Sequence, residues 1–409
     1  NRSQNESAVT EYSLDKHDLS YLMAKNDSSV QGQDSRLIKT QIFTDIRNEF
    51  DKLFRTGVNM NKKVINHIIQ SKQKIWTSSF YIVVKTFPGL IKIENKRKFF
   101  RQFIQTISSR KVQRISVERL NLFQTTFTEL ANQPREFFHR KWNISFIGEE
   151  GEDAGGVSRE FYLNLSRAFL NPNYNYFRPA SHGYAFHPSP TAHLTGSEPG
   201  VFKFIGRIVG KALFDGYFLD AHFTRAFYKQ MIGHPLTYED FEDYDPQYFK
   251  NLKWLINNDP APLEMTFTVE HNEFGLTQEV ELKPGGAQTK VTQENKNEYV
   301  DLLLKHKLCD QAKLQIQQFL RGLYDVVPLS LLRIFDPKEI ELMISGLPEI
   351  NINDLEKHTE YVGYTKDAQV IKWFWKTIRS YDSNLKAGFL QFVTGTSKVP
   401  LEGFEYLKG

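Results

Sequence analysis

Cysteine is almost absent from this sequence, since Cys309 is the only one among 409 residues. A single thiol excludes an internal disulfide, a CxxC-type zinc site and an iron–sulfur cluster, and it suits a reducing compartment. Long apolar runs are also missing: no segment approaches the roughly 18 residues that a membrane helix needs, and the polar N-terminus has no signal-peptide core. The sequence therefore predicts a cytoplasmic or nuclear protein that does not span a membrane.

The usual catalytic signatures are missing as well. There is no HExxH or GxSxG motif, and the 11 histidines show no paired metal-ligand spacing. The glycine-rich turn Gly148 to Gly156 lacks a GK[ST] ending and carries four acidic residues that would repel a phosphate, while Gly210-Lys211 is followed by Ala212. The sequence thus predicts no metal and no cofactor. For Cys309, a structural cysteine in a helix is a commoner explanation than a catalytic one.

What is present is an ordinary globular composition. Hydrophobic residues make up 40%, aromatic residues 14% and charged residues 24%, which excludes a largely disordered chain. The length predicts two or three domains with a sizeable core. Because the chain begins at Asn1 and not with Met, we expect it to be a piece of a longer protein.

The net charge of +4 conceals two regions of opposite charge. Asp51 to Lys141 holds 19 Lys and Arg against 5 Asp and Glu, a balance of +14. His234 to Leu282 holds 11 Asp and Glu against 2 Lys, a balance of −9, interspersed with aromatic residues. We interpret the basic charges as a solvated helix face, because no motif that reads nucleic-acid grooves accompanies them. The acidic, aromatic region predicts a docking surface for a basic partner.

Hydrophobic periodicity predicts helices along most of the chain and only a few strands. One strand is expected through Ile144 and Phe146, and a hairpin is expected from residues 263–269 and 277–282. After a helix that ends at Gly346, we expect an extended segment as far as Leu355. The predicted helices are 38–54, 64–84, 97–107, 158–170, 202–216, 223–233, 299–304, 314–323, 339–346, 370–381 and 383–393.

Eight segments occur in an order that carries a family resemblance. They are GEEGEDAGGVSREFY, FKFIGRIVGKALFDG, FTRAFYKQMIG, LKPGGAQTKVTQENKNEYV, IELMISGLP, TEYVGY, IKWFW and FLQFVTGTSKVP. The stretch from about Trp142 to Gly409 resembles the HECT-type ubiquitin ligases, in particular the giant Mule-type members, and the basic region from about Phe54 resembles them less strongly. The resemblance implies an α+β fold, a bilobed HECT domain with a mainly helical N-lobe, a smaller docking subdomain and an incomplete C-lobe, preceded by helices.

Composition, periodicity and the resemblance together predict a division of the chain into segments. A polar, partly disordered segment at 1–36 is followed by a basic helical region at 37–141 and the N-lobe at 142–360, with the docking subdomain at about 234–310. Tyr361, Val362, Gly363 and Tyr364 are the implied hinge, and residues 365–409 start the C-lobe. Gly363 can visit positive φ cheaply and is the natural pivot, although a plain loop glycine would look the same.

The implied activity is that of a ligase that takes ubiquitin from a ubiquitin-conjugating enzyme as a cysteine thioester and passes it to a lysine of a protein substrate. In the family the nucleophilic cysteine follows the TGTSKVP segment, so we expect it beyond Gly409 and expect no catalytic residue within the chain. The resemblance places the conjugating enzyme in a groove whose positions match Leu252, Ile256, Val269, Tyr299 and Leu303. Two pairs of these residues lie four apart on a helical face, which is compatible with a shared apolar trough. For Val269 alone, ordinary core packing is an equally good explanation.

Two other functions are compatible with the sequence. The chain could be a non-catalytic interaction module that keeps the docking lobe but has lost the nucleophile. It could also combine that lobe with a basic, helical segment that binds nucleic acid, which salt-dependent binding would reveal.

Overall fold

The computed structural model describes residues 62–71, 88–150, 153, 155–181, 185–195, 200–273, 276–346, 350–394, 399 and 403–404. The chain divides into two compact units, Asn1–Ile65 and Asn66–Gly409. Of the first unit, only residues 62–65 are described, at the start of helix α3 (Lys62–Ser71). The predicted polar segment 1–36 and the predicted helix 38–54 therefore lie outside the described residues. The domain boundaries expected at 141, 360 and 364 remain predictions.

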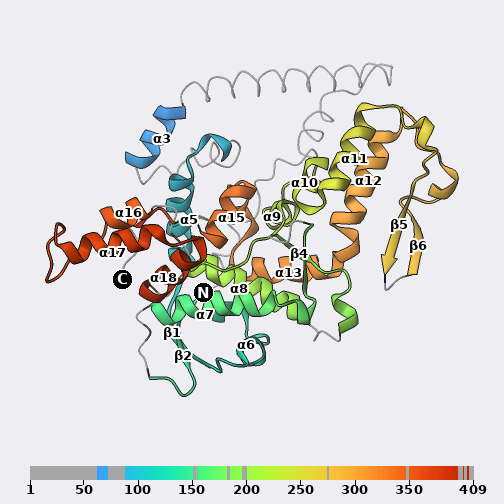
Figure 1. Cartoon of the computed structure of the whole chain (residues 1–409). Helices are drawn as coiled ribbons and strands as arrows, with labels where there is room; N and C mark the ends of the chain where they lie inside the picture. Colours follow the sequence, from blue (N-terminus) through green and yellow to red (C-terminus); the bar gives the residue numbers. More distant parts are fainter. Residues whose placement is uncertain are drawn as a thin grey trace, which may run out of the picture. The chain divides into compact units, whose positions relative to one another are not determined.

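Helices dominate the second unit, with a few small sheets, and this confirms the predicted α+β class (Figure 1). Most helices expected from periodicity are present, with ends shifted by a few residues, while residues 72–84 of the helix expected at 64–84 lie outside the described residues. Those after α3 are α5 (Ile93–Ile107), α6 (Leu122–Leu130), α7 (Gly156–Phe169), α8 (Val201–Asp215), α9 (Arg225–Met231), α10 (Phe241–Tyr244), α11 (Pro246–Asn257), α12 (Lys296–Leu308), α13 (Lys313–Val326), α14 (Leu329–Leu332), α15 (Pro337–Ser345), α16 (Ile352–Lys357), α17 (Gln369–Ser380) and α18 (Ser383–Thr394).

Three two-stranded sheets accompany the helices in the described ranges. Their strands are β1 (Ser109–Val117) parallel to β2 (Arg140–Phe146), β3 (Phe177–Pro179) antiparallel to β4 (Phe186–Pro188), and β5 (Thr268–Glu273) antiparallel to β6 (Leu276–Glu281). Strand β1 corrects the expectation of a wholly helical basic region, because Arg110, Lys111 and Arg114 lie on this strand. At its end, buried and exposed residues alternate, with Ile115 and Val117 buried. This two-residue alternation is typical of a strand that packs one face against the core.

The interpretation of the basic charges as a solvated helix face is wrong for Lys96 and Arg97 of helix α5, although Arg101 on the same helix is exposed. Lys96 and Arg97 are both buried, and Lys96 Nζ forms an ion pair with Glu339 Oε2 at 2.5 Å. Burial raises the pKa of Glu339, and the hydrogen bond from Lys96 opposes that shift. The two partners are 243 residues apart in the chain, so local sequence patterns could not reveal the pair.

Helices α8 and α13 pack against each other in the middle of the second unit (Figure 1). The predicted helix at 202–216 is confirmed, and Gly216 ends it with a φ of 80° that favours glycine. Helix α8 is buried on almost every side, including Gly206 and Lys211. Helix α8 is therefore packed on nearly all its faces, whereas periodicity alone would suggest that only one apolar face is buried.

Two predictions about irregular segments need correction. Leu263 belongs to a short 3-10 helix (Ala261–Leu263) and not to the hairpin, whose first strand starts at Thr268. The segment expected to be extended contains helix α16. Asn351 caps this helix, since its side-chain oxygen accepts hydrogen bonds from the backbone N–H groups of Asn353 and Asp354. An asparagine before such a run is an N-cap signal in the sequence itself.

Candidate functional site

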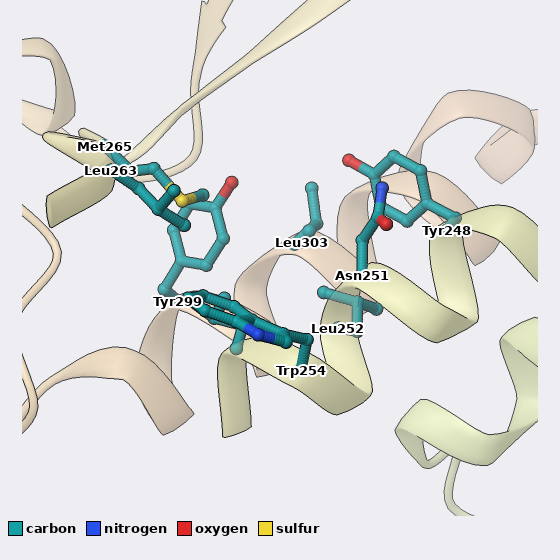
Figure 2. A pocket seen from close by; sticks show the side chains of 9 residues that line it. Tyr248, Asn251, Leu252, Trp254, Leu263, Met265, Tyr299 and Leu303 are labelled. Carbon is teal, nitrogen blue, oxygen red and sulfur yellow. The ribbon is translucent and has the colours of Figure 1, made fainter. Parts of the chain in front are cut away.

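An apolar groove of about 420 Å³ lies on the surface where α11 runs beside α12 (Figures 1 and 2). We call it the docking groove. Figure 2 shows side chains from both helices converging on it, with Leu263 and Met265 closing the far side. Its lining residues are Tyr248, Asn251, Leu252, Trp254, Leu255, Leu263, Met265, Tyr299 and Leu303.

Local sequence explains how these side chains reach one face. Helix α11 begins after Asp245, whose carboxylate accepts a hydrogen bond of 3.0 Å from Tyr248 N, and Pro246 takes the first helical position. Tyr248, Leu252 and Leu255 then follow at helical spacing, as Tyr299 and Leu303 do on α12, and each set shares a face.

The groove has a buried floor and an exposed rim. On the floor, Leu252 is 3% exposed, Tyr299 4% and Leu303 1%. On the rim, Trp254 is 47% exposed and Leu263 51%. An exposed tryptophan beside an exposed leucine, next to a concave apolar surface, is the arrangement found at protein-binding sites.

Three of the five predicted groove residues line the groove, and two do not. Leu252, Tyr299 and Leu303 are lining residues, as the resemblance implied. Ile256 and Val269 are absent from the lining and belong to the apolar core behind it. Val269 pairs with Val280 across the β5–β6 ladder and is buried in the same core that contains Leu252, Tyr299 and Leu303. The role of the five residues in binding a partner stays a prediction.

The sequence interpretation missed the other six lining residues, which are Tyr248, Asn251, Trp254, Leu255, Leu263 and Met265. Tyr248 and Asn251 carried a readable signal, because they precede Leu252 and Leu255 at helical spacing. Trp254 and Leu263 carried none, since apolar residues that remain exposed look like core residues in a sequence.

Part of the acidic charge near the groove is used inside the fold. Asp240 is fully buried and pairs with Lys229 Nζ at 2.7 Å. Asp243 accepts a hydrogen bond from Arg225 N, and Asp245 caps α11. The other acidic residues described between 234 and 282 form no ion pair within the described ranges, and most are exposed. The docking surface is therefore less acidic than the count of charges in the sequence suggests.

The glycine-rich turn is built around its own carboxylates, not around a phosphate site. Asp153 accepts hydrogen bonds from the backbone N–H groups of Ile144, Gly155 and Ser158, so its carboxylate occupies the N-terminal end of α7. Burial alone would raise the pKa of Asp153, but the hydrogen bonds from Ser158 and these backbone groups lower it. The position that a phosphate takes in nucleotide-binding loops is thus filled by the chain itself.

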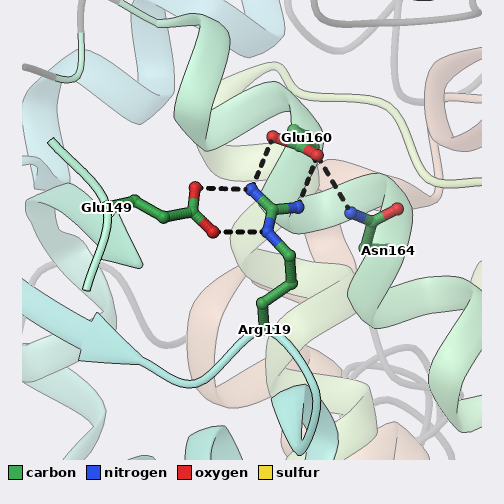
Figure 3. Close-up of polar contacts among 4 residues, drawn as sticks. All are labelled: Arg119, Glu149, Glu160 and Asn164. Atoms are coloured by element: carbon green, nitrogen blue, oxygen red, sulfur yellow. Dashed lines mark hydrogen bonds and ion pairs between the residues drawn. The ribbon is translucent and has the colours of Figure 1, made fainter. Parts of the chain in front are cut away.

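A neighbouring arginine ties the turn to helix α7 (Figure 3). Arg119 Nε and Nη2 donate to the two carboxylate oxygens of Glu149 at 2.6 and 2.8 Å, and Arg119 Nη1 donates to Glu160 at 2.6 Å. Asn164 adds a hydrogen bond to Glu160. The guanidinium lies 4.0 Å from the centroid of the Phe146 ring, which fixes its plane.

The comparisons with known proteins decide the family. The model of the HECT-domain (ubiquitin-transferase) family matches residues 163–408, which is more than half of the chain. The chain belongs to this family. The resemblance carried by the eight segments is thereby confirmed.

Named relatives of this HECT domain are ubiquitin ligases of great length. The chain is 40% identical over 94% of its length to E3 ubiquitin-protein ligase UPL2 of Arabidopsis thaliana, of which it covers 11%. It is 39% identical over 95% of its length to E3 ubiquitin-protein ligase TOM1 of Saccharomyces cerevisiae, of which it covers 12%. It is 38% identical over 85% of its length to E3 ubiquitin-protein ligase HUWE1 of Mus musculus, of which it covers 8%. The chain thus spans about a tenth of the length of these relatives.

Two features are absent from the described part of the HECT domain and the helices before it. None of its helices is long and apolar enough to cross a membrane. In the same ranges, no group of three or more His, Cys, Asp or Glu side chains could hold a metal ion.

The predicted hinge of the HECT domain lies between α16 and α17. Gly363 has a φ of 80°, and a Cβ built on it would meet no atom within 4 Å, so the backbone angle and not crowding favours glycine there. Val362 and Tyr364 are exposed, whereas Tyr361 accepts a hydrogen bond of 2.8 Å from Trp375 Nε1. A hydrogen bond therefore holds Tyr361 to α17, whereas the side chains of Val362 and Tyr364 are exposed to solvent. Whether this segment acts as a pivot or as a plain loop stays a prediction.

Proposed function

We propose that this HECT domain binds a ubiquitin-conjugating enzyme in the docking groove. We further propose that the longer protein takes ubiquitin onto a cysteine and transfers it to substrate lysines. One observation carries the first part: an apolar groove whose floor is buried while Trp254 and Leu263 remain exposed on its rim. Large exposed apolar side chains beside a hollow supply the central anchors that most protein interfaces need.

The size and charge of the groove support a protein partner. A hollow of about 420 Å³ is large enough to receive a large apolar side chain of another protein. The exposed Glu264, which lies between the lining residues Leu263 and Met265, favours a partner with a basic rim. Such charges mainly accelerate association and select the partner, while the apolar anchors supply most of the affinity.

The proposed transfer needs a thiolate. Its sulfur attacks the thioester carbon of the charged conjugating enzyme, the old carbon–sulfur bond breaks, and the new thioester is later attacked by a substrate lysine amine. Cys309 is poorly suited to this role. It lies at the C-terminal end of α12, its Sγ is 3.3 Å from Gln230 Nε2, and burial raises its pKa. The proposal therefore assigns the nucleophile to a cysteine other than Cys309.

Shortening the rim residues tests the groove. We expect Trp254→Ala and Leu263→Ala each to weaken binding of a conjugating enzyme by about 1 to 3 kcal/mol, which is ~5- to 150-fold in Kd, because an anchor is lost. Isothermal titration calorimetry measures the affinity. Trp373→Ala is the matched control, since Trp373 is also an exposed tryptophan but lies on α17. Equal affinity of all three variants and the parent would refute the groove assignment.

The floor residues make poorer probes than the rim. Leu252 and Tyr299 are buried, so their replacement by alanine should also destabilise the fold by about 2 to 5 kcal/mol. A loss of binding in those variants therefore has meaning only at a temperature where they remain folded.

The thiol assignment makes a separate prediction. Incubated with activating enzyme, conjugating enzyme and ubiquitin, the chain should form no ubiquitin adduct that a reducing agent removes, because its one thiol is half-buried and its pKa is raised. Non-reducing and reducing gels read the result, and Cys309→Ser should behave like the parent. A reducible adduct that is present in the parent and absent from Cys309→Ser would make Cys309 the nucleophile.

A further inference from the structure

A second hollow of about 380 Å³ adjoins the docking groove at Tyr248, which lines both. We call it the carboxylate pocket, for the ligand argued below. It brings together Arg178 on strand β3 and Lys307 on helix α12, with Ser181 and Gln311 nearby. Unlike the docking groove, it is lined by charged and polar side chains, so its ligand must be polar as well.

The two cations of the pocket are not neutralised by a direct ion pair. Both are half-buried, and neither Arg178 nor Lys307 forms a salt bridge with a carboxylate in the described chain. Burial lowers the pKa of Arg178. Burial also lowers the pKa of Lys307, and the charge of Arg178 lowers it further. Two partly desolvated positive charges that disfavour each other form a site that an anion would stabilise.

Two tyrosines hold these cations in place. The Arg178 guanidinium lies 5.3 Å from the centroid of the Tyr244 ring, and Lys307 Nζ lies 5.6 Å from that of Tyr248. An arginine held by an aromatic ring keeps its planar fork of donors available at its edge, and this fork matches the two oxygens of a carboxylate.

Two acidic residues also line the pocket and limit the charge of its ligand. Asp245 is engaged as the cap of α11 and partly offsets the shift of the pKa of Lys307, while Glu270 is exposed. A phosphate dianion would be repelled by both carboxylates. The two carboxylates offset the two cations, so a dianion is disfavoured and the pocket accepts at most one negative charge, placed beside Arg178 and Lys307.

We propose that the carboxylate pocket receives the side-chain carboxylate of an Asp or Glu of the protein bound in the docking groove. The inference rests on the proposed function. Tyr248 lines both hollows, so a partner bound in the docking groove lies next to the carboxylate pocket. Arg178 binds the carboxylate through two hydrogen bonds and Lys307 adds its charge. The pocket selects among conjugating enzymes by the position of one acidic residue.

Neutral variants of the two cations provide the first measurement. Arg178→Met keeps an apolar side chain of similar length but removes the charged guanidinium that lies against Tyr244, and we expect it to weaken binding of a conjugating enzyme about tenfold, with a smaller loss for Lys307→Met. Arg321→Met and Lys313→Met are matched controls, because both residues are exposed on α13. Parental affinity in Arg178→Met would overturn the proposal. Should Arg178→Met not fold, Arg178→Lys, which keeps the charge but loses the fork, must weaken binding too.

A double-mutant cycle identifies the source of the carboxylate. Each surface Asp or Glu of the conjugating enzyme is changed in turn to Asn or Gln and tested against the parent chain and Arg178→Met. One such change should weaken binding to the parent about tenfold and have no further effect on Arg178→Met. If every change acts on both chains alike, the carboxylate does not come from this partner and the proposal fails.

A measurement without the partner separates this proposal from the proposed function. N-acetyl-glutamate N-methylamide is titrated while NMR follows the Arg178 Nε–H resonance, with N-acetyl-glutamine N-methylamide as the neutral control. The resonance should shift saturably with the glutamate derivative, less with inorganic phosphate and not with the control. No shift with the glutamate derivative would overturn the pocket, even where Trp254→Ala supports the groove. A clear shift together with unchanged binding in Trp254→Ala would instead count against the groove.

Discussion

Replacing Gly322 by alanine should destabilise the chain by about 3 to 5 kcal/mol. A Cβ on Gly322 would lie 1.9 Å from the carbonyl oxygen of Lys203 and 2.9 Å from Arg207 N. Both are backbone atoms of helix α8, so no side chain can turn aside and the two helices must move apart. Because only a short 3-10 helix (Asp310–Ala312) separates α13 from α12, we expect this movement also to disturb the support of the docking groove.

Urea denaturation of the full chain measures this effect, and two further variants sharpen it. Gly206→Ala should be equally severe, since its Cβ would lie 2.0 Å from Phe319 O on α13. Gly388→Ala is the control within helix α18, because its Cβ would meet no atom within 4 Å. The control should gain up to about 1 kcal/mol from the better helix propensity of alanine. If Gly322→Ala is as stable as Gly388→Ala, the result would contradict the expectation that the contact of α8 with α13 leaves no room for a Cβ at Gly322.

The second large effect is expected at Lys211, whose side chain is fully buried. Its Nζ donates hydrogen bonds of 2.7 Å to Asp215 Oδ1 and to Arg140 O, and it lies 5.0 Å from the ring centroids of Trp142 and Phe214. Lys211→Met removes the cation and leaves the carboxylate of Asp215 and the carbonyl of Arg140 without this donor. We expect a loss of about 3 to 5 kcal/mol, as for other broken buried ion pairs.

A double variant tests whether the unpaired charge causes that loss. Burial already raises the pKa of Asp215, and the interaction with Lys211 holds this shift back. Without the lysine, the pKa of Asp215 should rise further. Lys211→Met should therefore be less destabilised in acid, where Asp215 is protonated, than at neutral pH. Lys211→Met/Asp215→Leu should recover most of the stability at neutral pH. Equal destabilisation in the single and double variants would point to lost packing instead.

The regular parts of the fold were predictable because their signals are local. The apolar spacing of α8 and the glycine that ends it lie within 16 residues, and the β5–β6 hairpin lies within one short stretch. The same reasoning missed β1, although Ile115 and Val117 alternate with polar residues. Its partner β2 runs parallel, so the two strands are joined by a long connection and not by a tight turn that a sequence would reveal.

The candidate site was predictable only in part, for a related reason. Leu252, Tyr299 and Leu303 were identified because the family resemblance marks their positions, and they line the groove. Trp254 and Leu263 were not, because a sequence does not show which apolar side chains are left uncovered after packing. The pairing of Arg178 with Lys307 in one pocket was equally hidden, since they lie on β3 and α12.

The sequence by itself determined the helical character of the chain, the lack of nucleotide and metal motifs and, through eight ordered segments, the family. These properties depend on residue type and short spacing. Only the tertiary structure decided that Lys96 and Lys211 are buried in ion pairs, that Val269 belongs to the core and that Trp254 stands at the rim of a groove. Burial and charge pairing depend on neighbours that can be hundreds of residues away, as Glu339 is from Lys96, and the folded chain alone brings them together.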